Sequence, residues 1–75
     1  MTRRERIDEV IATVLRPLLE VDGGDIEVVR FEGSVLVLRL TGALLADPGT
    51  AYVKRGVIEP AIRAAAGDLE IAYER

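Results

Sequence analysis

The chain has 75 residues, of which 49% are hydrophobic and 31% charged, and this predicts one small globular domain over residues 1–75 rather than a disordered segment. Thirteen acidic and ten basic residues give a net charge of −3 with no basic stripe, which argues against nucleic acid as a partner. The chain has no cysteine, which excludes disulfides and thiolate metal ligands supplied by the chain itself. No apolar run resembles a signal peptide or a membrane span, so we expect a cytoplasmic protein without membrane contact.

The first predicted element is an amphipathic helix that begins after Thr2. Thr2 and Glu5 have the spacing of a capping box, and apolar residues recur at helical spacing as far as Leu19. Pro17 lies inside this pattern and lacks an amide donor. A kink or a short restarted turn is therefore expected near Arg16.

The segment Val21–Asp25 predicts the turn that ends this helix. Either Gly23 or Gly24 can adopt the left-handed conformation that closes a helix, while Asp22 and Asp25 are good turn residues. Two carboxylates with glycine carbonyls between them also suit a hard cation, but their spacing does not match that of an EF-hand loop. The structural turn is therefore favoured over a cation site.

Two β-branched segments, residues 26–31 and 34–41, predict a β-hairpin that turns at Glu32 and Gly33. In the second strand, the residues expected on the core face are Leu36, Leu38 and Leu40. For the first strand, two core pairs remain open, namely Ile26 with Val28, or Val29 with Phe31.

Residues 42–50 predict a loop between the second strand and a second helix. Its glycine breaks the strand, Asp47 can cap the helix, and Pro48 suits the first helical position. Leu44 and Leu45 are unusual in a loop. They either tuck into the small core or form a contact patch for another protein or another copy of the chain.

A helical pattern extends from Pro48 to about Ala66, and Gly56 and Pro60 within it predict a bend. A final strand follows, with one apolar face made of Leu69, Ile71 and Tyr73. The order α-β-β-α-β predicts an α+β two-layer fold in which two helices cover one face of a three-stranded mixed sheet. The strand order stays open.

The side-chain inventory argues against an enzyme. The chain has no histidine or cysteine, one serine (Ser34) and one lysine (Lys54), so groups that titrate or attack near neutral pH are scarce. The residues themselves predict no catalytic site, no cofactor and no metal.

The segment Arg16–Val28 contains Arg-Pro, then Asp-Gly-Gly, then Glu-Val. This resembles the signature of the NifU C-terminal (Nfu-type) domain, a family of iron–sulfur cluster scaffolds and carriers. Further similarities are Leu40-Thr41-Gly42-Ala43, Pro48, and Ile58-Glu59 with Ile62. The resemblance covers nearly the whole chain and implies the same α-β-β-α-β order.

The chain departs from the family at the loop. Members of the family carry a Cys-x-x-Cys-Pro motif there, through which two domains share a cluster, but this chain has Leu44 and Asp47 at the two cysteine positions. A leucine cannot ligate iron, and one aspartate does not replace two thiolates. We therefore expect that cluster binding by this chain alone is absent.

The sequence-based hypothesis is a cluster-free NifU-like module that binds an iron–sulfur assembly factor or a metalloenzyme being matured. The candidate contact residues are Leu44, Leu45 and Asp47. One alternative is a small structural subunit that self-associates through the same leucines as a homodimer or within a larger assembly. Another is a cluster carrier whose ligands come from a partner or a small thiol.

Overall fold

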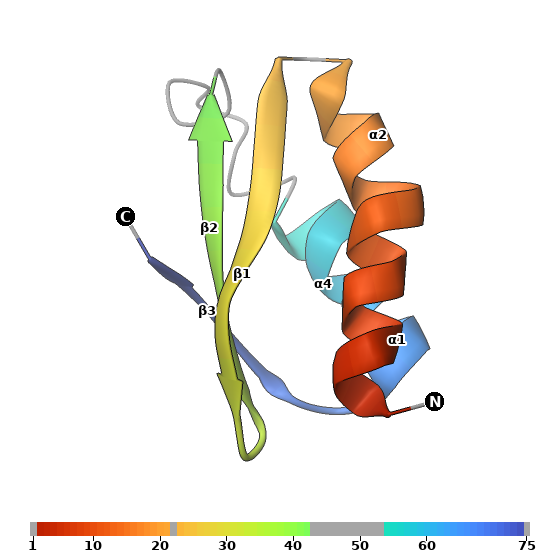
Figure 1. Cartoon of the computed structure of the whole chain (residues 1–75), viewed down its shortest axis with the longest axis vertical. Helices are drawn as coiled ribbons and strands as arrows, with labels where there is room; N and C mark the ends of the chain where they lie inside the picture. Colours follow the sequence, from red (N-terminus) through yellow and green to blue (C-terminus); the bar gives the residue numbers. More distant parts are fainter. Residues whose placement is uncertain (1, 22, 43–53, 75) are drawn as a thin grey trace.

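The fold has two layers, a three-stranded sheet and a set of helices on one of its faces (Figure 1). The computed structural model describes residues 2–21, 23–42 and 54–74. The predicted order α-β-β-α-β is confirmed, and the first helix of that scheme comprises three consecutive segments. None of the helices in the described ranges is long and apolar enough to cross a membrane.

The first helix begins with the predicted capping box. Segment α1 covers Arg3–Val10, and Thr2 is its N-cap residue. The Glu5 amide donates to the Thr2 hydroxyl at 3.1 Å, and the Thr2 amide donates to the Glu5 carboxylate at 3.1 Å. This reciprocal pair satisfies two amides that a helix start otherwise leaves unpaired.

The helix continues through η1 (Ile11–Leu15), a π-helical turn, into α2 (Arg16–Glu20), which has Pro17 in its first turn. The predicted restart near Arg16 is thus confirmed. The buried residues recur at every fourth position, namely Ile7, Ile11, Leu15 and Leu19. Four residues are more than one turn of an α-helix, so residues spaced by four would rotate steadily away from the core. Four residues are less than one turn of the wider π-helix, so the π turn rotates the following residues back toward the core.

The second helix has the same construction. A π-helical turn, η3 (Lys54–Ile58), leads into α4 (Glu59–Ala66), which has Pro60 in its first turn. Its buried residues, Ile58, Ile62 and Ala66, again lie four positions apart. The predicted start of this helix at Pro48 lies outside the described residues.

Strands β1 (Gly24–Glu32) and β2 (Val35–Gly42) form the predicted antiparallel hairpin. Glu32 pairs with Val35, so the turn consists of Gly33 and Ser34, and the prediction of Glu32 and Gly33 is wrong by one residue. Gly33 has a φ of 59°, a conformation that a two-residue hairpin turn requires and that glycine adopts without strain.

A β-bulge decides the inner face of β1. Val28 pairs with Leu38, but the next pair joins Arg30 to Val37, so Val29 is an extra residue. The bulge shifts the alternation by one position, and the residues of β1 that pack in the core are Ile26, Val28 and Phe31. The first predicted pair, Ile26 with Val28, thus lies on the inner face but omits Phe31. The second predicted pair contains Phe31 but wrongly includes Val29.

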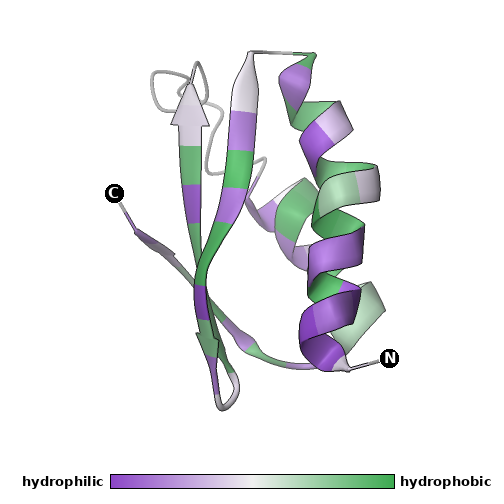
Figure 2. Cartoon of the chain, viewed as in Figure 1, coloured by the Kyte–Doolittle hydropathy of each residue, from purple (hydrophilic) through white to green (hydrophobic). Residues whose placement is uncertain are grey.

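Strand β3 (Glu70–Glu74) runs parallel to β2, and the sheet order is β1-β2-β3. The predicted apolar face of this strand is confirmed, since Leu69 is buried and Ile71 and Tyr73 pack against the core. The predicted leucines of β2, Leu36, Leu38 and Leu40, are all buried. Hydrophobic and hydrophilic residues alternate visibly along β1 in Figure 2.

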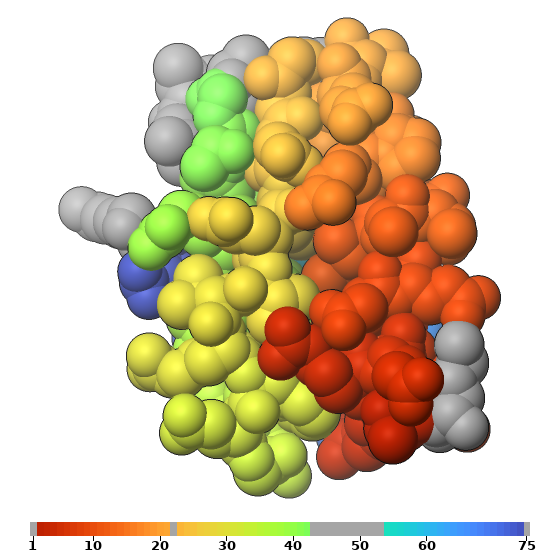
Figure 3. All heavy atoms as spheres, viewed as in Figure 1, coloured from red at the N-terminus to blue at the C-terminus, as the bar shows by residue number. Residues whose placement is uncertain are grey.

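The helical layer lies directly against the hairpin. In the space-filling view of Figure 3, the atoms of the first helix, red to orange, adjoin those of β1, yellow. The shared core contains buried residues from both helices and from all three strands or their flanks. Burial of this apolar surface is the main force that holds the two layers together.

Candidate functional site

The predicted contact residues lie in a segment that the structure does not describe. Leu44, Leu45, Asp47 and Pro48 belong to residues 43–53, and the predicted turn residue Asp22 is also outside the described ranges. The structure does describe both ends of the 43–53 segment, Gly42 and Lys54. The candidate site is therefore built from these two ends.

At the first end, three glycines meet. Gly24 pairs with Gly42 as the last pair of the β1–β2 ladder, and Gly42 has a φ of 79°. A β-carbon added to Gly42 would lie only 2.3 Å from the Gly23 carbonyl oxygen. Of the two glycines predicted to adopt the left-handed conformation, Gly23 does so, with a φ of 76°, while Gly24 begins β1.

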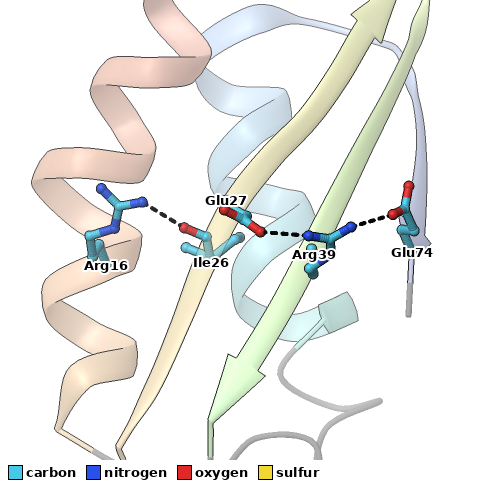
Figure 4. Close-up of polar contacts among 5 residues, drawn as sticks. All are labelled: Arg16, Ile26, Glu27, Arg39 and Glu74. Carbon is cyan, nitrogen blue, oxygen red and sulfur yellow. Dashed lines mark hydrogen bonds and ion pairs between the residues drawn. The ribbon is translucent and has the colours of Figure 1, made fainter.

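Arg16 holds the helix to the strand that starts at these glycines. Its Nε donates to Asp25 Oδ1 at 2.9 Å, and its Nη2 donates to the Ile26 carbonyl oxygen at 2.9 Å, the contact drawn in Figure 4. The Ile26 amide donates to the same Asp25 oxygen at 2.8 Å. This side chain thus joins α2 to the beginning of β1.

The Asp25 carboxylate is stabilised in its charged form. The hydrogen bond from the Ile26 amide, followed by that from Arg16, lowers the pKa of Asp25 below its ordinary value. One of its oxygens therefore already has two protein partners, which supports the interpretation of Asp25 as a turn residue. Together, Arg16 and the glycines fix the point at which the chain leaves β2.

At the second end, Lys54 stacks on an aromatic ring. Its Nζ lies 4.4 Å from the centroid of the Tyr73 ring, within cation–π range. The Tyr73 hydroxyl donates to Glu59 Oε2 at 3.0 Å, and Arg63 Nη1 donates to Glu59 Oε1 at 3.4 Å. These contacts join the start of the second helix to β3.

Tyr73 is half-buried, and its environment disfavours the phenolate. Burial, followed by the hydrogen bond to Glu59, raises the pKa of Tyr73 above its ordinary value. The hydroxyl thus remains a hydrogen-bond donor throughout the physiological pH range. No step of acid–base chemistry near neutral pH follows from this arrangement, which suits an anchoring role.

Sequence reasoning missed the contacts that fix the two ends. Arg16 and Asp25 stand in the signature segment but had no assigned partners, and nothing in the spacing predicted that Gly42 would touch Gly23. Lys54 is the only lysine of the chain, and Tyr73 was predicted as a core residue alone. No sequence signal links Lys54 to Tyr73, because a cation–π contact depends on the distance between the two groups in the folded chain.

A comparison with family models finds a match to the NifU-like domain over residues 7–71. The matched range includes both ends of the 43–53 segment. A comparison with curated proteins finds no match.

Proposed function

The chain belongs to the NifU-like domain family, and from this membership we propose that it is a non-catalytic accessory module that binds a partner protein. Membership relates the chain to iron–sulfur cluster assembly. The partner that we propose is an assembly factor or a metalloenzyme undergoing maturation.

The donor set of the chain does not fit an iron–sulfur cluster. Such clusters are held by cysteine thiolates, with histidine in some cases, and this chain contains neither residue. Within the described ranges, no three carboxylates gather to hold a metal ion. We therefore propose that the family's cluster-ligating residues have been replaced, and that the chain acts through protein contact.

The observation that supports this proposal is that the residues on either side of 43–53, Gly42 and Lys54, are both held by contacts within the fold. Gly42 lies against Gly23 at one end, and Lys54 stacks on Tyr73 at the other. A binding segment held by its ends loses less conformational freedom when it docks, so more of the contact energy becomes affinity. Within this segment, the proposed apolar contacts are its two leucines, Leu44 and Leu45.

The test is a pull-down of the tagged chain from a lysate of its own organism, with mass spectrometry and an iron assay of the eluate. We expect iron–sulfur assembly proteins or an iron-containing enzyme. Recovery of the chain alone, without iron, would contradict the proposal and favour a self-associating subunit.

A double variant, Leu44→Ser with Leu45→Ser, locates the contact. The matched control is Val14→Ser with Leu18→Ser, since these helix residues are 48% and 50% exposed and lie outside the segment. We expect the loop variant to lose the partner and the helix variant to retain it, with both folded by circular dichroism. Retention of the partner by the loop variant would refute Leu44 and Leu45 as the contact.

A further inference from the structure

The sheet face opposite the helices, here called the outer face, carries three rows of residues in register across the strands. The rows are Glu27, Arg39 and Glu74; then Arg30, Val37 and Ala72; then Glu32, Val35 and Glu70. Each row takes one residue from β1, one from β2 and one from β3. None of the described helices covers this face, since they all lie on the other side of the sheet (Figure 1).

The first row is electrostatically satisfied. Arg39 lies between two glutamates, donating to Glu27 Oε1 at 3.1 Å and also to Glu74 Oε1 (Figure 4). Glu74, followed by Glu27, raises the pKa of Arg39 above its ordinary value. This row offers one guanidinium and two carboxylates that already have partners.

The third row is different. Val35 is 37% exposed and is flanked in register by Glu32 and Glu70, both of which are exposed. Within the described part of the chain, neither glutamate forms an ion pair. Since neighbouring strands are about 4.8 Å apart, the backbones that carry these two glutamates lie roughly 10 Å apart, one on each side of the valine.

The third row therefore combines an apolar centre, Val35, with an acidic residue on either side. In the second row, Ala72 is exposed beside this centre, whereas Val37 is only 5% exposed and adds little apolar surface. The three rows contain four glutamates and two arginines, a formal charge of −2. An apolar centre within a polar rim is the usual composition of a protein interface.

Charge decides the kind of partner. If a second copy packed on this face with strands aligned, a two-fold axis along β2 would set Glu32 of one copy against Glu70 of the other. A two-fold axis across the strands at Val35 would set Glu32 against Glu32 and Glu70 against Glu70. Both arrangements oppose like charges, whereas a basic surface complements the third row.

We propose that the outer face binds a basic segment of another protein in which an apolar side chain lies between two lysine or arginine side chains. The apolar side chain contacts Val35, and the two cations pair with Glu32 and Glu70. This inference rests on the sheet alone and does not depend on the proposed role of residues 43–53.

The test uses the 75-residue, ¹⁵N-labelled chain and the synthetic peptide Lys-Ser-Val-Ser-Lys, followed by amide chemical shifts. In an extended peptide, alternate residues share a face, so this spacing places the valine and both lysines on the same side. We expect shifts centred on Val35 and Val37 that disappear in high salt. Two comparison peptides, Glu-Ser-Val-Ser-Glu and Lys-Ser-Ser-Ser-Lys, should bind at least ~10-fold more weakly because they lack the positive charge or the apolar side chain. Equal binding of either comparison peptide, or shifts centred on the helices, would overturn the proposal.

Charge reversal identifies the carboxylates. The variant Glu32→Lys with Glu70→Lys should weaken binding at least ~10-fold, since it replaces two attractions by two repulsions. The control Glu9→Lys with Glu20→Lys makes the same change in net charge on exposed helix positions and should bind normally. Equal loss in both variants would refute the site, because it would leave only net charge as the cause. Val35→Ser, which keeps every charge, should also weaken binding, and it decides the matter if the reversed variant does not fold.

Discussion

Gly42 and Gly23 touch through their backbones, and this contact closes the open end of the hairpin beside the first helix. An added β-carbon at Gly42 would meet the Gly23 carbonyl oxygen at 2.3 Å, whereas one added at Gly33 would meet nothing within 4 Å. Both glycines have positive φ values, 79° and 59°. An alanine at Gly42 would therefore suffer both backbone strain and steric overlap, whereas an alanine at Gly33 would suffer backbone strain alone.

Gly42→Ala should lower the free energy of unfolding by ~3 kcal/mol or more, because strain and overlap add. Gly33→Ala should cost only about 1 kcal/mol, from strain alone. Urea denaturation followed by circular dichroism measures both. Equal losses in the two variants would show that the contact between Gly42 and Gly23 has no energetic weight.

Asp25→Asn should make the free energy of unfolding depend less on pH at acidic pH. The pKa of Asp25 is lowered on folding, so its contribution is complete above its unfolded value of about 4 and is lost as the pH falls through the folded value. The unfolding free energy of the wild-type chain should therefore fall below about pH 4 more steeply than that of the variant. Urea titrations at several acidic pH values measure the two slopes. Asp68→Asn, at an exposed aspartate, is the control for the loss of one carboxylate elsewhere on the surface.

Tyr73→Phe should remove an alkaline loss of stability. Because the pKa of Tyr73 is raised on folding, its contribution is complete below its unfolded value of about 10 and is lost as the pH rises above that value. The variant should also cost about 1 kcal/mol near neutral pH through loss of the hydrogen bond to Glu59. In an alkaline titration followed by tyrosinate absorbance, the variant should lack the ionisation that occurs at the highest pH in the wild-type chain. An unchanged alkaline limb would show that another group governs it.

Much of the fold was predictable because local chemistry specifies it. The capping box of Thr2 and Glu5, the left-handed glycine after the first helix, and the leucine face of β2 all follow from short-range patterns. The hairpin turn was displaced by one residue because Glu32 keeps its place in the ladder and pairs with Val35. Such a choice depends on register, which the turn residues alone do not determine.

Other features depended on tertiary packing. The strand order follows from how the second helix returns the chain to the edge of β2, and the bulge at Val29 follows from fitting β1 to that strand. Each proline was expected to disturb its helix, but sequence alone did not indicate that a π turn would keep every fourth residue on one face. The candidate site was predicted in a segment outside the described residues, while the contacts at its ends join residues far apart in the chain.

The parallel pairing of β2 and β3 has a consequence for the order of folding. The β1–β2 hairpin closes through a two-residue turn, so its contacts are local and cost little chain entropy. Strand β3 can align with β2 only after the intervening chain has crossed the sheet, and such non-local pairing is slow. The hairpin and first helix should thus gain protection from hydrogen exchange before residues 70–74, and the C-terminal strand should be the last to join the sheet.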